Sequence, residues 1–173
     1  WGSDTQPGCT NPPFIPGHEF VGVVAEMGSN VEGYEIGDRL TSDQIVPCGK
    51  CRFCKSGQYW MCQPHKIYGY YTELNGGMAE YIRLPKNSLK YKIPKEMRLE
   101  DALLIEPYSC SKHCIDRAQI GCEDIVVQSG AGTLGLGMIT YAKKKSPRKL
   151  IVLDMKEERL EKAKKFEADI VWN

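Results

Sequence analysis

The chain has almost no net charge and no long apolar run, and these two absences exclude several classes of protein. Its 23 Lys and Arg residues are balanced by 22 Asp and Glu residues, so a net charge of +1 gives no general attraction to nucleic acid or to anionic membranes. The longest apolar stretch, residues 125–142, contains four glycines, Gln128, Ser129 and two threonines, which make it too polar for a membrane span. The sequence therefore predicts neither a nucleic-acid nor a membrane partner.

Helical periodicity is also missing, from roughly the first hundred residues. Strand-like runs occur there instead, separated by turns that are rich in Gly and Pro. These runs cover residues 21–28, 39–46, 76–84 and 89–94. A helical pattern then spans residues 100–118, and we expect it to break at Pro107. This part of the chain is therefore predicted to be a mostly β domain.

The C-terminal part alternates short apolar strands with helices. Each strand is followed by a helix, in the order 124–129, 134–145, 150–154 and 156–167. Such an order predicts βαβ packing with parallel strands. Residues 169–173 read as the start of a third strand, and residue 1 is Trp, so we expect both ends of the sequence to be truncated.

Four of the eight cysteines form a closely spaced cluster, C-x2-C-x2-C-x7-C. They are Cys48, Cys51, Cys54 and Cys62. Four thiolates complete the tetrahedral shell of Zn²⁺ and leave no open position, so this metal is expected to be structural. The alternative is a pair of disulfides, but bridges between residues three apart are geometrically awkward. The sequence shows no secretory segment, so we expect a cytoplasmic protein with reduced thiols.

A glycine-rich turn of the form G-x-G-x-x-G joins the first C-terminal strand to its helix. Gly130 permits the tight turn, Gly132 lets a pyrophosphate approach the backbone, and Gly135 lets helix and strand pack closely. Asp154 ends the next strand, where its charge accepts ribose hydroxyls and repels a 2′-phosphate, which favours NAD over NADP. The alternative is a glycine-rich contact without a ligand. The predicted dinucleotide site comprises Gly130, Gly132, Thr133, Leu134, Gly135 and Asp154.

Two further motifs are weak alone and informative together with the rest. They are Gly17-His18-Glu19 before an apolar strand and Glu106-Pro107 before the βαβ unit. Combined with the cysteine cluster, the run GGMAEY at residues 76–81 and the glycine turn, they make the sequence similar to the zinc-dependent medium-chain alcohol/polyol dehydrogenases. The sequence that follows Trp1-Gly2 and the sequence around the cysteine cluster most resemble the erythritol/L-threitol branch of that family.

The resemblance implies a GroES-like domain at residues 1–108 and a Rossmann domain at residues 109–173. It also implies a catalytic zinc held by His18, Glu19 and Glu106, with a further cysteine ligand preceding the first residue of the sequence. The implied reaction transfers hydride from a secondary alcohol of an erythritol- or threitol-like polyol to NAD. Family members are commonly dimers or tetramers, so a homo-oligomer is expected.

Several alternatives stay open from the sequence alone. A threonine or galactitol dehydrogenase would share these motifs. The alternative to an enzyme is a truncated, non-catalytic zinc-binding module without affinity for NAD, and the glycine turn and Asp154 argue against it. His65 and His113 are expected to be structural, and Cys110, Cys114 and Cys122 are expected to be small packing residues. Glu167 occupies a position where a helix-ending glycine is usual, and we expect it to weaken that helix end.

Overall fold

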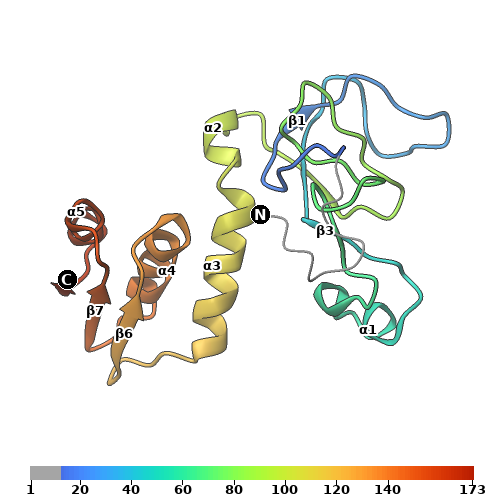
Figure 1. Cartoon of the computed structure of the whole chain (residues 1–173). Coiled ribbons are helices and arrows are strands. Elements are labelled where there is room, and N and C mark those ends of the chain that lie inside the picture. Colours follow the sequence, from blue (N-terminus) through green and yellow to red (C-terminus); the bar gives the residue numbers. More distant parts are fainter. Residues whose placement is uncertain (1–12) are drawn as a thin grey trace. The chain divides into compact units, whose positions relative to one another are not determined.

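The chain divides into two compact units. The structure, a computed structural model, describes residues 13–173, so Cys9 lies outside the described residues. Unit 1 ends at Leu104 and unit 2 begins at Ile105 (Figure 1). None of the helices in the described range combines the length and apolar character that a membrane span requires.

Unit 1 contains two small antiparallel sheets. One has the order β1-β2-β5, and the other pairs β3 with β4. Their bounds are β1 Gly22–Val23, β2 Arg39–Ser42, β3 Ile45–Val46, β4 Lys66–Ile67 and β5 Lys90–Lys92. The predicted strand at 39–46 is divided between the two sheets because the Asp43 side chain accepts a hydrogen bond from the backbone N–H of Ile45, 2.8 Å away. Such an Asx turn ends one strand and starts the next.

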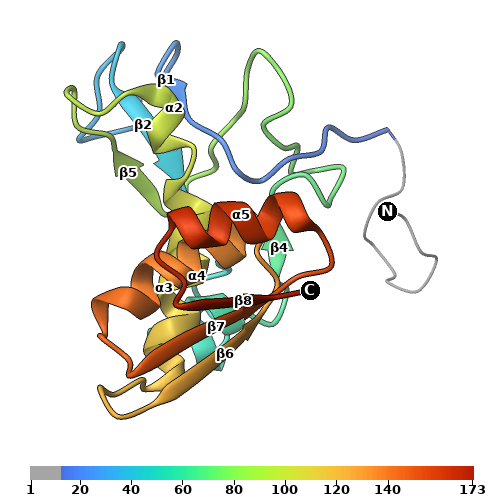
Figure 2. The same cartoon turned by 90° about the vertical axis from the view of Figure 1, so that its left-hand side faces the viewer.

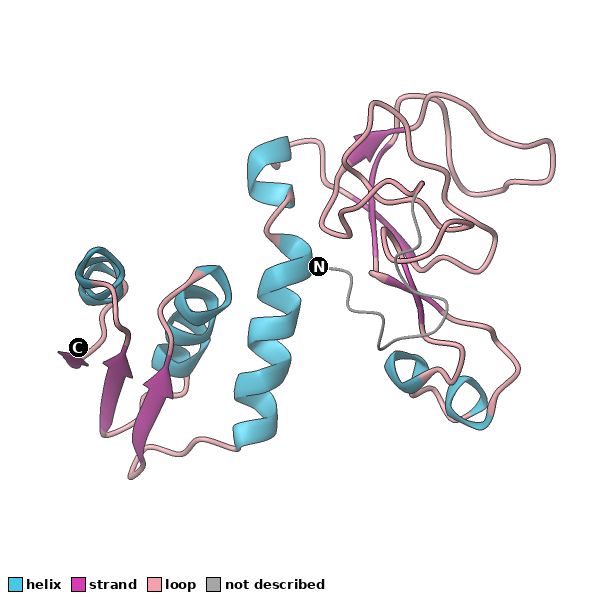
Figure 3. Cartoon of the chain, viewed as in Figure 1, coloured by secondary structure: helices cyan, strands magenta, loops and turns pink. Residues whose placement is uncertain are grey.

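Long loops make up most of unit 1, and here the strand predictions were partly wrong (Figure 3). Residues 76–84 form no strand, because the backbone N–H groups of Gly76, Gly77 and Met78 donate to carbonyls of residues 15–17 in an irregular loop contact. The predicted strand at 21–28 is reduced to β1. Two short helices, α1 Arg52–Lys55 and η1 Tyr59–Met61, lie within the cysteine cluster and had no periodic signal.

The predicted helix at 100–118 is interrupted, but not at Pro107. Helix α2 covers Leu99–Ala102 and helix α3 covers Ile105–Ala118, so the interruption lies at residues 103–104. Pro107 lies in the first turn of α3, where backbone N–H groups have no acceptor within the helix. A proline there removes no hydrogen bond, and it is therefore compatible with the helix.

Unit 2 begins with α3 and continues as the predicted parallel βαβ structure. Strands β6 Ile125–Ser129, β7 Lys149–Leu153 and β8 Ile170–Trp172 lie side by side in the order β6-β7-β8 (Figure 2). Helix α4 Thr133–Lys144 joins the first pair and α5 Glu157–Lys165 joins the second. Register pairs Val127 with Ile151 and Ile151 with Ile170, all parallel. The expectation of a mostly β part followed by a parallel βαβ part is confirmed.

The core of unit 2 covers one face of this sheet. Leu150 and Val152 of β7 are fully buried against residues of α3, α4 and α5. The neighbouring positions of β6 that point to the other face, Ile125 and Val127, are 58% and 60% exposed. The alternation follows the two-residue period of a strand and fixes which side chains face the helices.

Helix α5 ends in a Schellman motif with a non-glycine residue in the left-handed region. The N–H of Ala168 donates to the carbonyl of Ala163 at 3.1 Å, and the N–H of Glu167 donates to that of Lys164 at 3.0 Å. Glu167 has φ = 70°, a conformation that glycine adopts without a Cβ clash. The predicted weak helix end is thus present in the structure.

We expect Glu167→Gly to raise the free energy of unfolding by about 1 kcal/mol, because the left-handed conformation no longer strains the backbone. Urea denaturation of the two proteins measures the difference. Glu161→Gly, in the middle of the same helix, is the matched control and should lower stability by about 1 kcal/mol. Equal stability of Glu167→Gly and the parent would contradict the strain argument.

Candidate metal and nucleotide sites

The four cysteines of the cluster converge on one point. Their sulfur atoms all lie within 4.8 Å of one another, and none of the four thiols is in a disulfide. The Sγ of Cys54 is 3.5 Å from that of Cys51 and 4.0 Å from that of Cys48. Zn–S bonds of about 2.3 Å place tetrahedral sulfurs roughly 3.8 Å apart, so the donor set fits a zinc ion.

Local helix and turn geometry creates this arrangement. The spacing of three residues puts Cys51 at the N-terminus of α1 and Cys54 within it, and η1 delivers Cys62 to the same place. Backbone N–H groups also point at the sulfurs, from Cys48 to the Sγ of Cys62 at 3.3 Å and from Cys51 to the Sγ of Cys48 at 3.4 Å. Such donors favour thiolates, which are the form that binds metal.

The thiols of the cluster differ in acidity. Backbone N–H groups of Cys54 and Gln63 lower the pKa of Cys51 to about 6. Desolvation, together with the neighbouring thiols, raises the pKa of Cys54 to about 12. Four groups this close lose their protons as a coupled set. Metal binding releases the remaining protons, so the affinity for metal rises with pH.

His18 is held by a contact between loops of unit 1. The Gly77 N–H donates to the Gly17 carbonyl at 2.9 Å, and a Cβ built on Gly76 would lie 2.1 Å from that carbonyl oxygen. The imidazole of His18 is half-buried, with its ring centroid 5.8 Å from that of Tyr70. Glu19 follows it and is exposed. The turn therefore presents His18 and Glu19 on a backbone that close packing holds in place.

Glu106 lies in unit 2, in the first turn of α3, and is half-buried. The Cys110 thiol donates to its Oε1 over 3.5 Å, one helical turn away. Because His18 and Glu19 belong to unit 1, a metal site that includes all three residues stays a prediction. Cys110, Cys114 and Cys122 are exposed, so the expectation that they pack in the interior was wrong. Their small apolar character did not decide burial, because Cys110 and Cys114 lie at exposed positions of α3 and Cys122 lies in the exposed turn before β6.

The glycine turn has the geometry that the motif predicts. Gly130 has φ = 98°, and its N–H donates to the Leu153 carbonyl at 2.7 Å. A Cβ on Gly135 would lie 2.3 Å from the Gly130 oxygen, so only glycine permits this contact between helix and strand. A Cβ on Gly132 would meet only the guanidinium of Arg159, at 3.9 Å, which leaves its backbone open to a ligand. Thr133 and Leu134 begin α4 and are exposed.

Asp154 lies beside this turn and is only 7% exposed. Its Oδ2 accepts from the Ala131 N–H at 2.8 Å, and its Oδ1 accepts from the Lys156 N–H at 2.9 Å. These backbone donors, and after them the guanidinium of Arg159, hold the pKa of Asp154 below its ordinary value. The carboxylate is therefore ionised and fixed in orientation, as recognition of a ribose hydroxyl requires.

The sequence analysis missed Arg159. Its Nη1 lies 3.6 Å from Asp154 Oδ2 and close to Gly132, so it places a positive charge where a pyrophosphate would approach. The available signal was its position five residues after the strand-ending acid, in the first turn of the following helix. A run of Lys, Glu and Arg hid that signal, because charged residues on such a helix are usually solvated.

Comparison with known proteins identifies the family. The model of the alcohol dehydrogenase GroES-like domain matches residues 2–95. The chain belongs to this family. It is 46% identical over 176 residues to an erythritol/L-threitol dehydrogenase of Mycolicibacterium smegmatis, covering 100% of the chain and 49% of that protein. It is 40% identical to an L-threonine 3-dehydrogenase of Pyrococcus horikoshii, covering 94% and 45%.

A solved structure gives the same result. An alcohol dehydrogenase (rspB) from Escherichia coli CFT073, complexed with the cofactor NADH, matches with a TM-score of 0.82 and 34% identity, over 91% of this chain and 46% of that one. The chain spans about half the length of the curated relatives it matches. The family model, the solved structure and the partial coverage together support the predicted combination of a GroES-like part with part of a Rossmann sheet.

Replacing Cys51 with Ser should remove about one zinc ion per chain and lower the melting temperature of unit 1, because three thiolates cannot complete the tetrahedral shell. Zinc content by plasma mass spectrometry and thermal unfolding measure the two effects. Cys122→Ser, at an exposed position outside the cluster, serves as the control and should leave both unchanged. Unchanged zinc content in Cys51→Ser would show that the cluster does not hold the metal.

Proposed function

We propose that the chain is the part of a zinc-dependent dehydrogenase that holds the metal ligands and the pyrophosphate end of NAD. The reaction is the transfer of hydride from a secondary alcohol of a polyol to the nicotinamide. The observation that carries the proposal is the glycine turn, in which an open Gly132 backbone, the N-terminus of α4 and an oriented Asp154 carboxylate meet. The NADH complex of the similar Escherichia coli enzyme supports it.

The catalytic metal would be held by His18, Glu19 and Glu106. The donor set suits Zn²⁺, which accepts imidazole nitrogen, carboxylate oxygen and thiolate ligands. A bound zinc ion supplies Lewis acidity that lowers the pKa of an alcohol hydroxyl. The contribution of this chain is to hold the imidazole of His18 through the Gly17–Gly77 contact, so that the ligand needs little reorganisation on binding.

NAD is favoured over NADP by charge. The ionised Asp154 stands at the end of β7, where a 2′-phosphate would be brought against a carboxylate. Arg159 offsets part of that charge, but its guanidinium lies on the side of Gly132, toward the pyrophosphate. A 2′-hydroxyl can donate to the remaining lone pairs of Asp154, and a phosphate cannot.

For the substrate, we infer a short polyol of the erythritol or threitol type. The support is the 46% identity to the erythritol/L-threitol dehydrogenase, which extends over the whole chain. The second candidate is threonine, which the 40% identical Pyrococcus horikoshii enzyme favours. Turnover on tetritols, hexitols and threonine separates the two. We also infer a cytoplasmic homo-oligomer, a dimer or tetramer, from the family resemblance.

The protein should contain about two zinc ions per chain, and His18→Ala should reduce this to about one, because the cysteine cluster keeps its own metal. Metal analysis after desalting gives the count. His65→Ala is the matched control, since His65 lies in an exposed loop next to the cluster and should leave the count at two. A count of one in both the parent and His18→Ala would remove the proposed catalytic site.

Asp154→Asn should shift the preference between NADP and NAD toward NADP by about tenfold, because it removes the negative charge and keeps one acceptor for the Ala131 N–H. The ratio of the two dissociation constants, measured by calorimetry, checks this. Asp169→Asn is the control, because Asp169 accepts from the Leu150 N–H in a similar way but belongs to the opposite end of the strands. An unchanged ratio in Asp154→Asn would contradict the charge argument, and absence of dinucleotide binding in the parent would favour the non-catalytic zinc module.

A further inference from the structure

Gln128 is a polar residue in the buried row of the parallel sheet. It is the fourth residue of β6 and is 9% exposed, and its register partner on β7 is Val152, which is fully buried. The other described residues of this row that face the core, Val126 and Leu150, are aliphatic. An amide at such a position is costly unless it is hydrogen-bonded. Its hydrogen bonds therefore indicate what it does.

The amide nitrogen of Gln128 joins the two ends of the glycine turn. Nε2 donates to the Gly130 carbonyl at 2.8 Å and to the Gly135 carbonyl at 2.9 Å. Because both partners are acceptors, the amide must face them with its two N–H groups. One side chain thus fastens the end of β6 to the first turn of α4, on both sides of Gly132.

We propose that Gln128 is a positioning residue for dinucleotide binding, which locks the glycine turn in the conformation that receives the pyrophosphate. This inference rests on the proposed NAD function. Gln128 does not belong to the G-x-G-x-x-G motif, and it does not contact the ligand in this role. It acts through the carbonyls of Gly130 and Gly135.

The first effect of this lock is on spacing. The Gly130 carbonyl and Gly135 approach so closely that a Cβ on Gly135 would lie 2.3 Å from the Gly130 oxygen and 3.2 Å from Nε2 of Gln128. A contact between a carbonyl oxygen and a Cα–H group is weaker than an N–H···O hydrogen bond, so the donor that bridges the two segments adds the stronger restraint. The backbone N–H groups between them then keep a fixed direction.

The second effect is electrostatic. Carbonyl oxygens that turn toward a pyrophosphate repel it, whereas N–H groups attract it. Donation from Nε2 keeps the Gly130 carbonyl directed into the protein. On the same turn, the Ala131 N–H is already taken by Asp154. The orientation of the remaining N–H groups therefore depends on two side chains, Asp154 on one side and Gln128 on the other.

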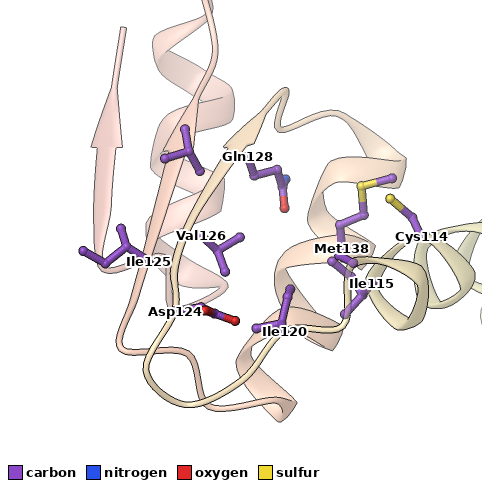
Figure 4. Close-up of a pocket in the computed structure, with 10 residues that line it drawn as sticks. Cys114, Ile115, Ile120, Asp124, Ile125, Val126, Gln128 and Met138 are labelled. Atoms are coloured by element: carbon purple, nitrogen blue, oxygen red, sulfur yellow. The ribbon is translucent and has the colours of Figure 1, made fainter.

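The oxygen of the same amide takes no part in this bridge between β6 and α4. Oε1 of Gln128 is buried and has no hydrogen-bond partner among the described residues. Figure 4 shows it directed into a pocket of about 360 Å³ whose walls are largely apolar, with Ile115, Val126 and Met138 among them. Removal of this oxygen breaks no hydrogen bond within the described part of unit 2. A variant that loses the whole amide therefore reports on the two donors.

The test replaces Gln128 with Met, which has a similar volume and shape and no donors. We expect the dissociation constant for NAD, measured by calorimetry, to rise about tenfold, which corresponds to about 1.4 kcal/mol. Without NAD, amide hydrogen exchange should accelerate at residues 130–136 and stay unchanged in β8. Gln128→Asn, whose shorter amide reaches only one of the two carbonyls, is a second variant and should show a smaller change in the same direction.

Val152→Ala is the matched control. Val152 is the cross-strand neighbour of Gln128 in the same buried row, and its truncation removes core packing while it leaves both hydrogen bonds of Gln128 in place. Its dissociation constant for NAD should stay within about twofold of that of the parent protein, at a temperature where both proteins are folded. If Gln128→Met and Val152→Ala raise the dissociation constant for NAD equally, Gln128 acts only through packing and the proposal is overturned.

The proposed NAD function and the role of Gln128 can be refuted separately. If the parent protein binds no NAD, the proposed function is wrong, and the exchange rates at residues 130–136 still decide whether Gln128 locks the turn. If the parent binds NAD and Gln128→Met binds it equally well with unchanged exchange, the proposed function stands and the role of Gln128 is refuted. If Gln128→Met does not fold, Gln128→Asn provides the same comparison.

Discussion

The turn that carries His18 and the glycine turn of unit 2 each depend on two stretches of backbone that lie closer together than any side chain would allow. In unit 1, a Cβ on Gly76 would lie 2.1 Å from the Gly17 oxygen, and this contact holds the turn that carries His18. In unit 2, a Cβ on Gly135 would lie 2.3 Å from the Gly130 oxygen, and this contact forms the dinucleotide turn. Functional groups on these turns are thus positioned by backbone packing, which leaves them less freedom than side chains on an open loop would have.

The cysteine cluster is organised on a different principle. Its sulfurs converge through a four-residue helix and a three-residue one, and neither presents a buried residue to the core. The described residues around it contribute backbone N–H donors to the sulfurs. A lobe of this kind gains its stability from the metal it binds, because local turns alone bury too little surface to offset the entropy of ordering them.

The sequence was a good guide where hydrophobic periodicity decides structure, and a poor one where backbone contacts do. Strands β6 and β7 and helices α4 and α5 lie close to their predicted bounds, because each buries an apolar face in one core. Residues 76–84 resemble a strand in sequence, yet the backbone N–H groups of residues 76–78 donate to the carbonyls of residues 15–17. The convergence of Cys48, Cys51, Cys54 and Cys62 could be predicted from their spacing, whereas Arg159 and Gln128 belong to no motif. Their roles follow only from the contacts they make with the glycine turn.

Charge at the nucleotide site has to satisfy two opposed demands. A carboxylate is needed at the end of β7 to select a ribose hydroxyl, but the same negative charge disfavours a pyrophosphate a short distance away. The structure separates the two demands in space. Asp154 directs one oxygen to the Ala131 N–H and the other to the Lys156 N–H, while Arg159 lies between the carboxylate and Gly132. Together with the positive end of α4, the guanidinium leaves the phosphate position attractive to an anion, although the ribose position repels one. Under the proposed function, one turn thus provides both the selectivity for NAD and the affinity for its pyrophosphate.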